Sequence, residues 1–440
     1  MIKKIKSLSQ SNFVKDTAIL QVGTIFSTGL SFLASVIFAR VLGPEKYGQY
    51  ALIFSLTGLF GIFMNWGADY ATITLLAEAW AKRDKEEIKN IIIFFIKFSL
   101  IATLTVGLLA LIFSPLLAQH LYHNEQIGHW ARVVILTICF QFIFSLLTII
   151  LQAARKIKHL TILENINKTA GIVIPTIFVL IGLGLYGIVW GNLLAVLFFV
   201  FLSFYIYHVL LKRTELLPSF KIILYGLKNI STKKYIKFGL TIAFDKNLAN
   251  LSAALPMIFL GMTVSPTQIS YFKIAFAYIG LSLILLKPIS RLLMVQLPKS
   301  KVMGYSILKE HFFKTTIYSF LIVLIIIIPM LILAKFLVLL VYGANYLPCV
   351  KLIYWLWPYA LISSLTVGIG TFYRTINKVK MAVVVNFLNL IIGTPIFYWL
   401  IKNYGLTGMI ISVTLCLGIP VLIILCYISY QLKKINIPIN

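Results

Sequence analysis

The segment LGLYGIVWG, residues 183–191, has a counterpart in the second half of the chain, NYGLTGMII, residues 403–411. Gly184 and Gly187 in the first copy correspond to Gly405 and Gly408 in the second, at an offset of 405 − 184 = 221 residues. Four other landmarks repeat in the same order at offsets between 219 and 222 residues: Pro44 with Pro266, Tyr122 with Tyr342, Arg155 with Arg374, and Pro175 with Pro395. This repetition predicts a duplicated unit, which is typical of secondary transporters.

The composition indicates a membrane protein. Of the 440 residues, 60% are hydrophobic and 12% are charged, and the mean hydropathy is +0.97. Apolar stretches of the length needed to cross about 30 Å of hydrocarbon recur along both halves. The predicted spans are residues 17–39, 50–70, 91–118, 133–153, 169–183 and 187–211, then 238–262, 269–297, 315–341, 353–373, 381–401 and 406–432. The sequence therefore predicts an all-α polytopic membrane protein with about twelve transmembrane helices.

The spans group into two six-helix bundles, residues 1–211 and residues 238–440, joined by a basic cytoplasmic linker, residues 212–237. Because each copy has an even number of spans, both copies enter the membrane in the same orientation, and the repeats are parallel rather than inverted. The other predicted loops are short. This argues against a separate catalytic domain outside the membrane.

The distribution of charge predicts the topology. The formal net charge is +27, which for a soluble chain would favour binding to nucleic acid. Most of the basic residues, however, fall in alternate loops, and the opposite loops hold only Arg40, Lys46, Arg132, Lys351 and Lys402. This is the positive-inside pattern, which places both termini in the cytoplasm. The charge then contacts anionic lipid headgroups, and no nucleic-acid partner is expected.

The sequence lacks the common motifs of nucleotide-binding, metal-binding and hydrolase sites. It contains no G-x-x-x-x-G-K-[ST], no H-E-x-x-H and no G-x-S-x-G, and its four cysteines include no C-x-x-C pair. These absences argue against nucleotide hydrolysis, a metal centre, a nucleophilic hydrolase and a disulfide framework. We therefore expect a transporter, not an enzyme, with no cofactor or metal.

Ionisable residues inside spans are the default functional candidates, because a charge in hydrocarbon is costly. Helix rise places Lys97, Asp245 and Lys287 roughly 12 to 16 Å from the cytoplasmic end of their spans. Three charges at a similar depth predict a shared polar cavity. The cationic candidates for substrate binding are Lys97, Lys273, Lys287 and Arg291. Asp245 is the candidate for coupling to H⁺ or Na⁺, with Asp69 and Lys246 as secondary candidates.

Several segments carry a family resemblance. ARVLGPEKYGQYALI (residues 39–53), LGMTVSPTQISYFKIA (260–275), LKPISRLLMVQLPKSK (286–301) and YGLTGMIIS (404–412) resemble the Wzx-type polysaccharide flippases of bacteria. These flippases belong to the exporter superfamily that also contains the MATE drug exporters and MurJ.

The resemblance implies two bundles around a central cavity and alternating access between the two sides of the bacterial inner membrane. It implies a cargo of undecaprenyl-pyrophosphate-linked oligosaccharide, such as an O-antigen repeat unit for lipopolysaccharide, carried from the cytoplasmic to the periplasmic leaflet. It also implies polysaccharide polymerases as partners. A cationic cavity would match the pyrophosphate.

Two other functions compete with this hypothesis. A MATE-like antiporter of cationic drugs would favour acidic residues in its cavity, whereas the intramembrane charges here are mostly lysines. A membrane glycan polymerase or ligase would need a long external loop, and the predicted external loops are short.

Overall fold

The computed structural model describes residues 12–65, 68–229, 233–286, 304–376 and 379–435, with a few single positions between 289 and 300. The described residues are almost entirely helical and include no β-strand. They form two compact units: Met1–Leu42 with Ile53–Asn247, and Gly43–Leu52 with Leu248–Asn440. We call these the first and the second unit. The bundle boundaries predicted from the sequence, 1–211 and 238–440, stay a prediction.

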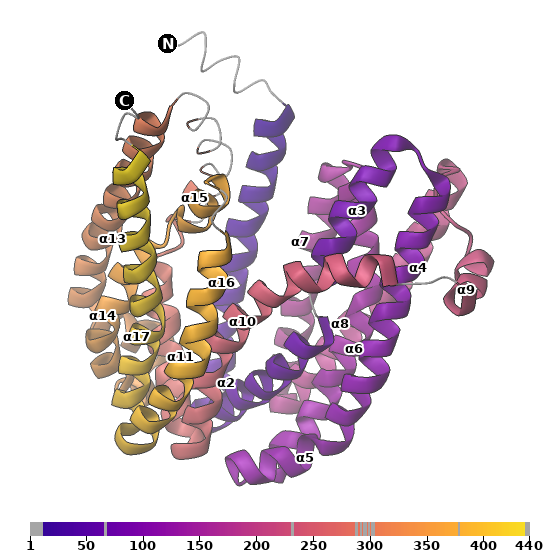
Figure 1. The fold of residues 1–440 in the computed structure, drawn as a ribbon. Helices are drawn as coiled ribbons and strands as arrows, with labels where there is room; N and C mark the ends of the chain where they lie inside the picture. The colour runs from indigo at the N-terminus through magenta and orange to yellow at the C-terminus, as the bar shows by residue number, and fades with distance from the viewer. Residues whose placement is uncertain are drawn as a thin grey trace, which may run out of the picture. The chain divides into compact units, whose positions relative to one another are not determined.

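The first unit is a bundle of long helices (Figure 1). Helices α5 and α6 pack against each other, as do α6 and α8, and α7 and α8. Its elements are most of α2 (Asn12–Asn65), α3 (Ala68–Lys82), α4 (Lys85–Ala102), the π-helical turn η1 (Thr103–Gly107), α5 (Leu108–Tyr122), α6 (Glu125–Ala153), α7 (Ile157–Phe178), the π-helical turn η2 (Val179–Leu183), α8 (Gly184–Arg213), α9 (Phe220–Asn229) and the first half of α10 (Lys233–Thr263).

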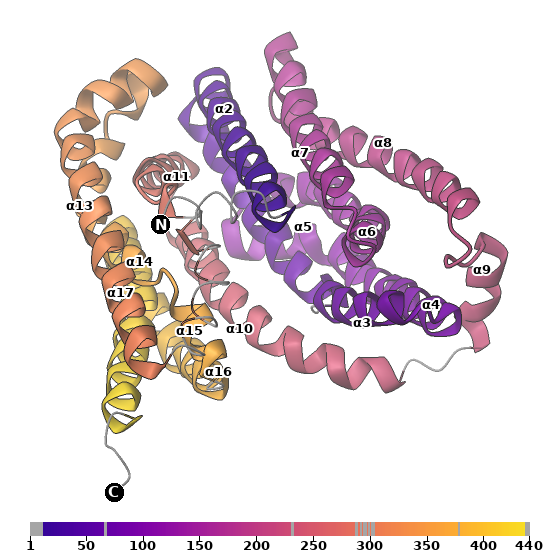
Figure 2. The same cartoon turned by 90° about the horizontal axis from the view of Figure 1, so that it is seen from above.

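The second unit contains the rest of α10 and the short segment Gly43–Leu52 of α2. Helix α14 contacts α11, α13 and α17 (Figure 2). The remaining elements are α11 (Pro266–Leu281), α13 (Tyr305–Tyr342), the 3₁₀ turn η3 (Ala344–Tyr346), α14 (Cys349–Leu365), α15 (Ile369–Thr375), α16 (Val379–Leu388), the π-helical turn η4 (Asn389–Gly393) and α17 (Thr394–Ile435).

The glycines that define the repeat adopt matching backbone conformations. Gly184 has φ 55° and ψ −132°, and Gly405 has φ 51° and ψ −123°. Residues with a Cβ rarely adopt positive φ, so both turns require glycine. After each turn the chain packs closely on the preceding helix: a Cβ on Gly187 would lie 2.8 Å from the Phe178 carbonyl carbon, and one on Gly408 would lie 2.0 Å from the Leu400 oxygen. The local geometry of the first half therefore recurs in the second.

Seven helical stretches of the described chain are long and apolar enough to cross a membrane. Three of them turn at Gly43, Gly184 and Gly405, in each case between two of the predicted spans. Helices α10 and α11 cover the predicted span 238–262 and the first part of the span 269–297. The stretches are Phe26–Met64, Lys85–Tyr122, Glu125–Ala153, Ile157–Leu211, Ser306–Tyr342, Cys349–Tyr373 and Val383–Tyr430. The all-α polytopic membrane fold is confirmed.

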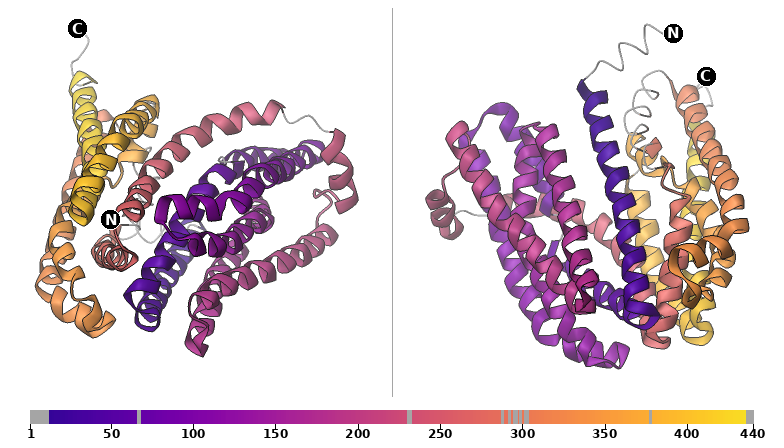
Figure 3. Two further views of the ribbon diagram at one scale, coloured as in Figure 1. Left: turned by 90° about the horizontal axis from the view of Figure 1, so that it is seen from below. Right: turned by 180° about the vertical axis from the view of Figure 1, so that it is seen from behind.

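Large apolar side chains lie on the outside of the helices, as expected for surfaces that face lipid. On α13, Ile325, Ile332 and Phe336 are 69%, 75% and 61% exposed. The α13 ribbon can be followed along the second unit in both panels of Figure 3. A water-soluble monomer rarely exposes so much contiguous apolar surface, so the protein is a multi-pass membrane protein.

The end of the first unit that includes the α3–α4 turn is polar. Asp84 caps α4, accepting a hydrogen bond of 3.0 Å from the Glu87 backbone N–H, a favourable arrangement for a carboxylate at a helix N-terminus. Lys85 pairs with Glu215 at 3.0 Å, and this hydrogen bond lowers the pKa of the Glu215 carboxyl. Tyr235 donates to Glu87 at 3.0 Å. These contacts tie α4 to the end of α8 and the start of α10.

Candidate functional site

Two prolines shape the interior of the second unit, beginning with Pro256 on α10. Proline has no N–H, so Pro256 leaves the carbonyl of Ser252, four residues earlier, without its helical donor. The thiol of Cys416, on α17, lies 3.8 Å from that carbonyl oxygen and donates to it. A neighbouring helix thus satisfies the group that the proline frees, as a membrane interior requires.

The same arrangement recurs at Pro420 on α17. The carbonyl that Pro420 frees belongs to Cys416, and the side-chain nitrogen of Asn389 in η4 lies 3.3 Å from it and 3.3 Å from the Cys416 sulfur. Asn389 therefore donates to Cys416, and Cys416 donates to Ser252. This relay joins α10, α17 and η4 at two proline positions.

A cavity of about 360 Å³ lies beside this relay. Among the described residues around it, none carries a charge, and seven have a hydroxyl, an amide or a thiol. The lining residues are Ser252, Ala253, Pro256, Phe276, Tyr359, Thr366, Ile369, Gly370, Tyr373, Asn386, Asn389, Val413, Cys416, Leu417, Pro420, Val421 and Ile424.

Lys273, a predicted substrate-binding residue, lies in a group of tyrosines in the second unit. Its ammonium nitrogen is 3.6 Å from the centre of the Tyr50 ring and 5.0 Å from that of Tyr47. Tyr346 contacts the rings of both Tyr47 and Tyr271 edge-on. Cation–π contacts compensate part of the lost hydration of a lysine, so these rings stabilise a cation inside the protein.

Segment 43–52, which carries Tyr47 and Tyr50, packs with its backbone directly against the backbone at Pro266. A Cβ on Gly48 would lie 1.7 Å from the Pro266 oxygen, so only glycine fits there. Pro266 is the first residue of α11, and it is the residue that the repeat aligns with Pro44. Equivalent corners of the two copies are thus in contact.

The first unit has a small polar pocket around Asp69, a secondary candidate for ion coupling. Its volume is about 100 Å³. Hydroxyl and amide side chains from α4, η1 and α6 accompany the carboxylate: Ser99, Thr103, Gln141 and Ser145. Thr103 begins the π-helical turn η1, and such turns are frequent at functional sites. One carboxylate with several neutral oxygens suits a proton or a monovalent cation.

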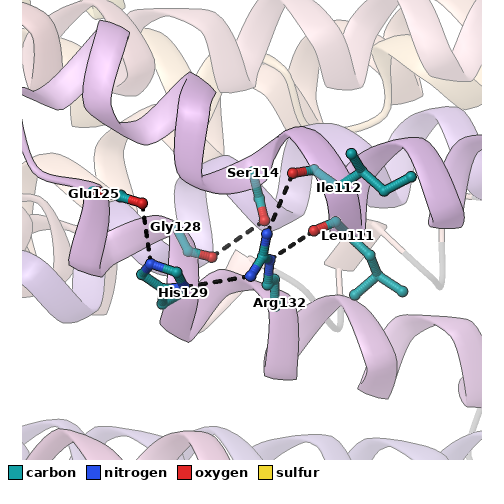
Figure 4. Close-up of polar contacts among 7 residues, drawn as sticks. All are labelled: Leu111, Ile112, Ser114, Glu125, Gly128, His129 and Arg132. Atoms are coloured by element: carbon teal, nitrogen blue, oxygen red, sulfur yellow. Dashed lines mark hydrogen bonds and ion pairs between the residues drawn. The ribbon is translucent and has the colours of Figure 1, made fainter.

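The α5–α6 hairpin shows a third proline whose freed carbonyl has an outside donor (Figure 4). Pro115 leaves the carbonyl of Leu111 without its helical N–H. Arg132 on α6 donates to that oxygen from Nε at 2.7 Å and to the Ile112 carbonyl from Nη2 at 3.4 Å. A charged donor thus replaces the missing amide.

Further contacts lock this hairpin (Figure 4). Ser114 donates to the Gly128 carbonyl at 3.2 Å, and a Cβ on Gly128 would lie 2.3 Å from the Pro115 Cα. Arg132 also donates to His129 Nδ1 at 3.4 Å, and His129 Nε2 contacts Glu125 at 3.2 Å. The hairpin holds its two helices in direct backbone contact.

The remaining predicted residues are placed only in part. Lys97 lies half-buried on α4 in the first unit. Asp245 and Lys246 belong to α10, but their side chains lie outside the described part of the structure. Lys287 and Arg291 lie outside the described residues. Their roles, and those of Lys273 and Asp69, stay predictions.

The cavity of the second unit was not predicted from the sequence. Its polar residues are neutral, whereas all the predicted site residues are charged. A usable signal was present, because Asn386 and Asn389 interrupt an apolar span, and Pro256 and Pro420 lie within spans.

Long apolar helices, glycine breaks at repeated positions and polar interior pockets define a polytopic membrane protein with a polar interior. The fold is similar to that of a multidrug resistance MATE family transporter of the MOP superfamily in an inward-facing conformation, with 16% identity and a TM-score of 0.77 over 94% of this chain and 96% of that chain. The outward-facing conformation of a MATE family transporter matches with a TM-score of 0.66 at 16% identity, over 96% of each chain.

A MOP superfamily transporter from Pyrococcus furiosus, described as having a binding pocket of reverse polarity, matches with 16% identity and a TM-score of 0.65 over 96% of this chain and 95% of that one. Stage V sporulation protein B of Bacillus subtilis (strain 168) is 27% identical over 119 residues. That match spans 27% of this chain and 23% of the length of the sporulation protein.

The model of the polysaccharide biosynthesis protein family matches residues 13–294. The chain belongs to this family, and it is a polysaccharide flippase-type protein of the MOP superfamily. Family and fold point to a transporter and not to an enzyme.

Proposed function

We propose that this protein moves undecaprenyl-pyrophosphate-linked oligosaccharide from the cytoplasmic to the periplasmic leaflet of the bacterial inner membrane, by alternating access. The observation that carries the proposal is the polysaccharide-biosynthesis family match on a transporter fold. A transporter in a glycan-building process carries a glycan intermediate, and a lipid-linked unit keeps its tail in the bilayer while its headgroup crosses.

The cations inside the membrane support an anionic headgroup. Lys97 and Lys273 are both half-buried, and the Lys273 ammonium rests on tyrosine rings. A lysine removed from bulk water gains from a phosphate partner. The cationic set proposed for the pyrophosphate is Lys97, Lys273, Lys287 and Arg291.

Transport is coupled, in this proposal, to H⁺ or Na⁺ at an intramembrane carboxylate. Asp245 and Asp69 are the two candidates, and the oxygen-rich pocket of about 100 Å³ favours Asp69. Binding of a cation there would shift the balance between the two access states, as coupling requires.

The leaflet distribution of the lipid-linked glycan tests the cargo. In cells depleted of the protein, completed lipid-linked repeat units should accumulate on the cytoplasmic leaflet. Normal glycan together with increased sensitivity to cationic drugs would instead support a drug exporter and overturn the proposal.

Proteoliposomes test the coupling. Asp69→Asn and Asp245→Asn should be compared with Asp84→Asn, which keeps a good helix cap on α4 outside the pocket. At least one of Asp69→Asn and Asp245→Asn should lose the stimulation of flipping by an ion gradient. Asp84→Asn should retain this stimulation. Gradient stimulation that survives in both Asp69→Asn and Asp245→Asn excludes coupling at these carboxylates.

A further inference from the structure

The walls of the 360 Å³ cavity carry polar groups with unused hydrogen-bonding capacity. Ser252 is only 6% exposed, and its hydroxyl has no hydrogen-bond partner among the residues that the structure describes. The side-chain nitrogen of Asn389 is occupied by Cys416, while its side-chain oxygen accepts from none of the described residues. A buried polar group without a partner costs free energy, especially within a membrane. A ligand that supplies donors and acceptors removes this cost.

The chemistry of the lining restricts the occupant. None of the described lining residues is charged, so the cavity offers no counter-ion for a phosphate and no carboxylate for a cation. Its hydroxyls and amides would be left unpaired by a lipid tail. The rings of Phe276 and Tyr359 are 4.9 Å apart at its wall and provide an apolar face. Hydroxyls, amides and aromatic faces together suit an uncharged sugar ring.

A second cavity in the protein has an apolar lining, so a polar lining is not common to the cavities of this protein. In the first unit, a cavity of about 400 Å³ is enclosed by α4, α6, α8 and α9. Its lining is almost entirely apolar: Ile96, Leu100, Phe142, Ile143, Leu146, Leu147, Ser203, Phe204, Tyr207, Phe220, Ile223, Leu224 and Leu227. The buried hydroxyl of Ser203 there donates to the Phe199 carbonyl at 2.6 Å, and that of Tyr207 donates to the Pro218 carbonyl at 2.8 Å. Both of these hydroxyls are already satisfied.

We infer that the cavity of the second unit is a binding site for an uncharged sugar ring of the transported glycan. The volume lies within the range of about 300–1,000 Å³ that is typical of small-molecule sites. This inference rests on the proposed function, and it separates two tasks: intramembrane cations hold the pyrophosphate, and this neutral cavity selects the sugar. Ser252 donates and accepts hydrogen bonds, Asn389 accepts through its side-chain oxygen, and Asn386 adds a second amide. Tyr359 and Phe276 contact the ring face.

Saturation-transfer NMR with free N-acetylglucosamine and free glucose tests the site, using the full-length protein in lipid nanodiscs. This measurement detects millimolar binding and does not require transport. Wild-type protein should transfer saturation to the ring protons of at least one of the two sugars. Ser252→Ala and Asn386→Leu should each weaken the binding about fivefold, the loss expected for one hydrogen bond. Ser203→Ala, a buried serine in the apolar cavity, should bind as wild type.

The outcomes separate this inference from the proposed function. Equal binding by wild type, Ser252→Ala and Asn386→Leu, or no binding of either sugar by wild type, overturns the sugar site even if flipping persists. Binding that depends on Ser252 supports the site even if no flipping is measured. Ser252→Ala removes only one oxygen atom and should keep the elution profile of the wild type in size-exclusion chromatography. A result with this variant therefore does not depend on how Asn386→Leu folds.

Discussion

The α5–α6 hairpin of the first unit and the cavity of the second unit lose the same backbone hydrogen bond to proline, but they replace it differently. At Pro115 the substitute donor is the Arg132 guanidinium at 2.7 Å. At Pro256 it is the Cys416 thiol at 3.8 Å, and at Pro420 it is the Asn389 amide at 3.3 Å. Charged donors form stronger hydrogen bonds than amides or thiols. The replacement contact is therefore stronger in the hairpin than in the helices around the cavity.

The largest expected effect is at the closest backbone contact of the hairpin. Gly128→Ala places a Cβ 2.3 Å from the Pro115 Cα and 2.4 Å from the Ser114 oxygen, so backbone must move. It should lower the free energy of unfolding by about 3 kcal/mol, measured by denaturation in mixed detergent micelles. Gly171→Ala, a helical glycine on α7 with no atom within 4 Å of the added Cβ, is the control and should be neutral or stabilising. Equal effects of the two variants would show that the hairpin is not tightly packed.

Removal of the charged donor should have the next largest effect. Arg132→Met leaves the Leu111 carbonyl without a donor and should cost about 2 kcal/mol. Pro115→Ala restores the amide that bonds this carbonyl, so Arg132→Met should cost much less in a Pro115→Ala background. Additive effects in this double-mutant cycle would contradict the assigned role of Arg132.

Removal of the amide donor from the relay of the second unit should have a smaller effect on the free energy of unfolding. Asn389→Leu removes the donor to the Cys416 carbonyl and should cost about 0.6 kcal/mol, the average for interhelical hydrogen bonds in a membrane. Pro420→Ala supplies a backbone donor and should reduce this loss. A loss as large as that of Arg132→Met would remove the contrast between the two regions.

The smallest effect is expected at the thiol. Cys416→Ala removes a weak donor 3.8 Å from the Ser252 carbonyl and should change the free energy of unfolding by no more than about 0.5 kcal/mol. The same unfolding measurement checks it, with Cys426→Ala on an exposed face of α17 as the control. A loss above 1 kcal/mol would mean that the thiol, and not the amide, makes the stronger contact of the relay.

Much of the fold was predictable because membrane spans and turns are encoded locally. Apolar length located the helices, and the repeated glycines located turns whose φ and ψ values match at Gly184 and Gly405. At Pro115, Pro256 and Pro420 the carbonyl that the proline frees has a side-chain donor from another helical element.

The site was less accessible to prediction because it depends on residues that are distant in the sequence. Cys416 and Ser252 are 164 positions apart and meet only after both helices pack. Lys273 was identified as an intramembrane cation, but nothing in its own span indicated Tyr47 and Tyr50, which come from the other copy of the repeat. A charged residue stands out in the sequence of a membrane span. Neutral polar residues that come together only in the folded protein do not.

The assignment of Gly43–Leu52 to the second unit, and of Lys233–Asn247 to the first, has a consequence for biosynthesis. The first unit stays incomplete until the ribosome has made residues up to Asn247, because Tyr235 must reach Glu87 and Phe94. The close contact of Gly48 with Pro266 cannot form until Pro266 has been synthesised, more than two hundred residues later. The first unit therefore cannot finish folding before the start of the second half has been synthesised, and segment 43–52 cannot complete its packing before Pro266 has followed.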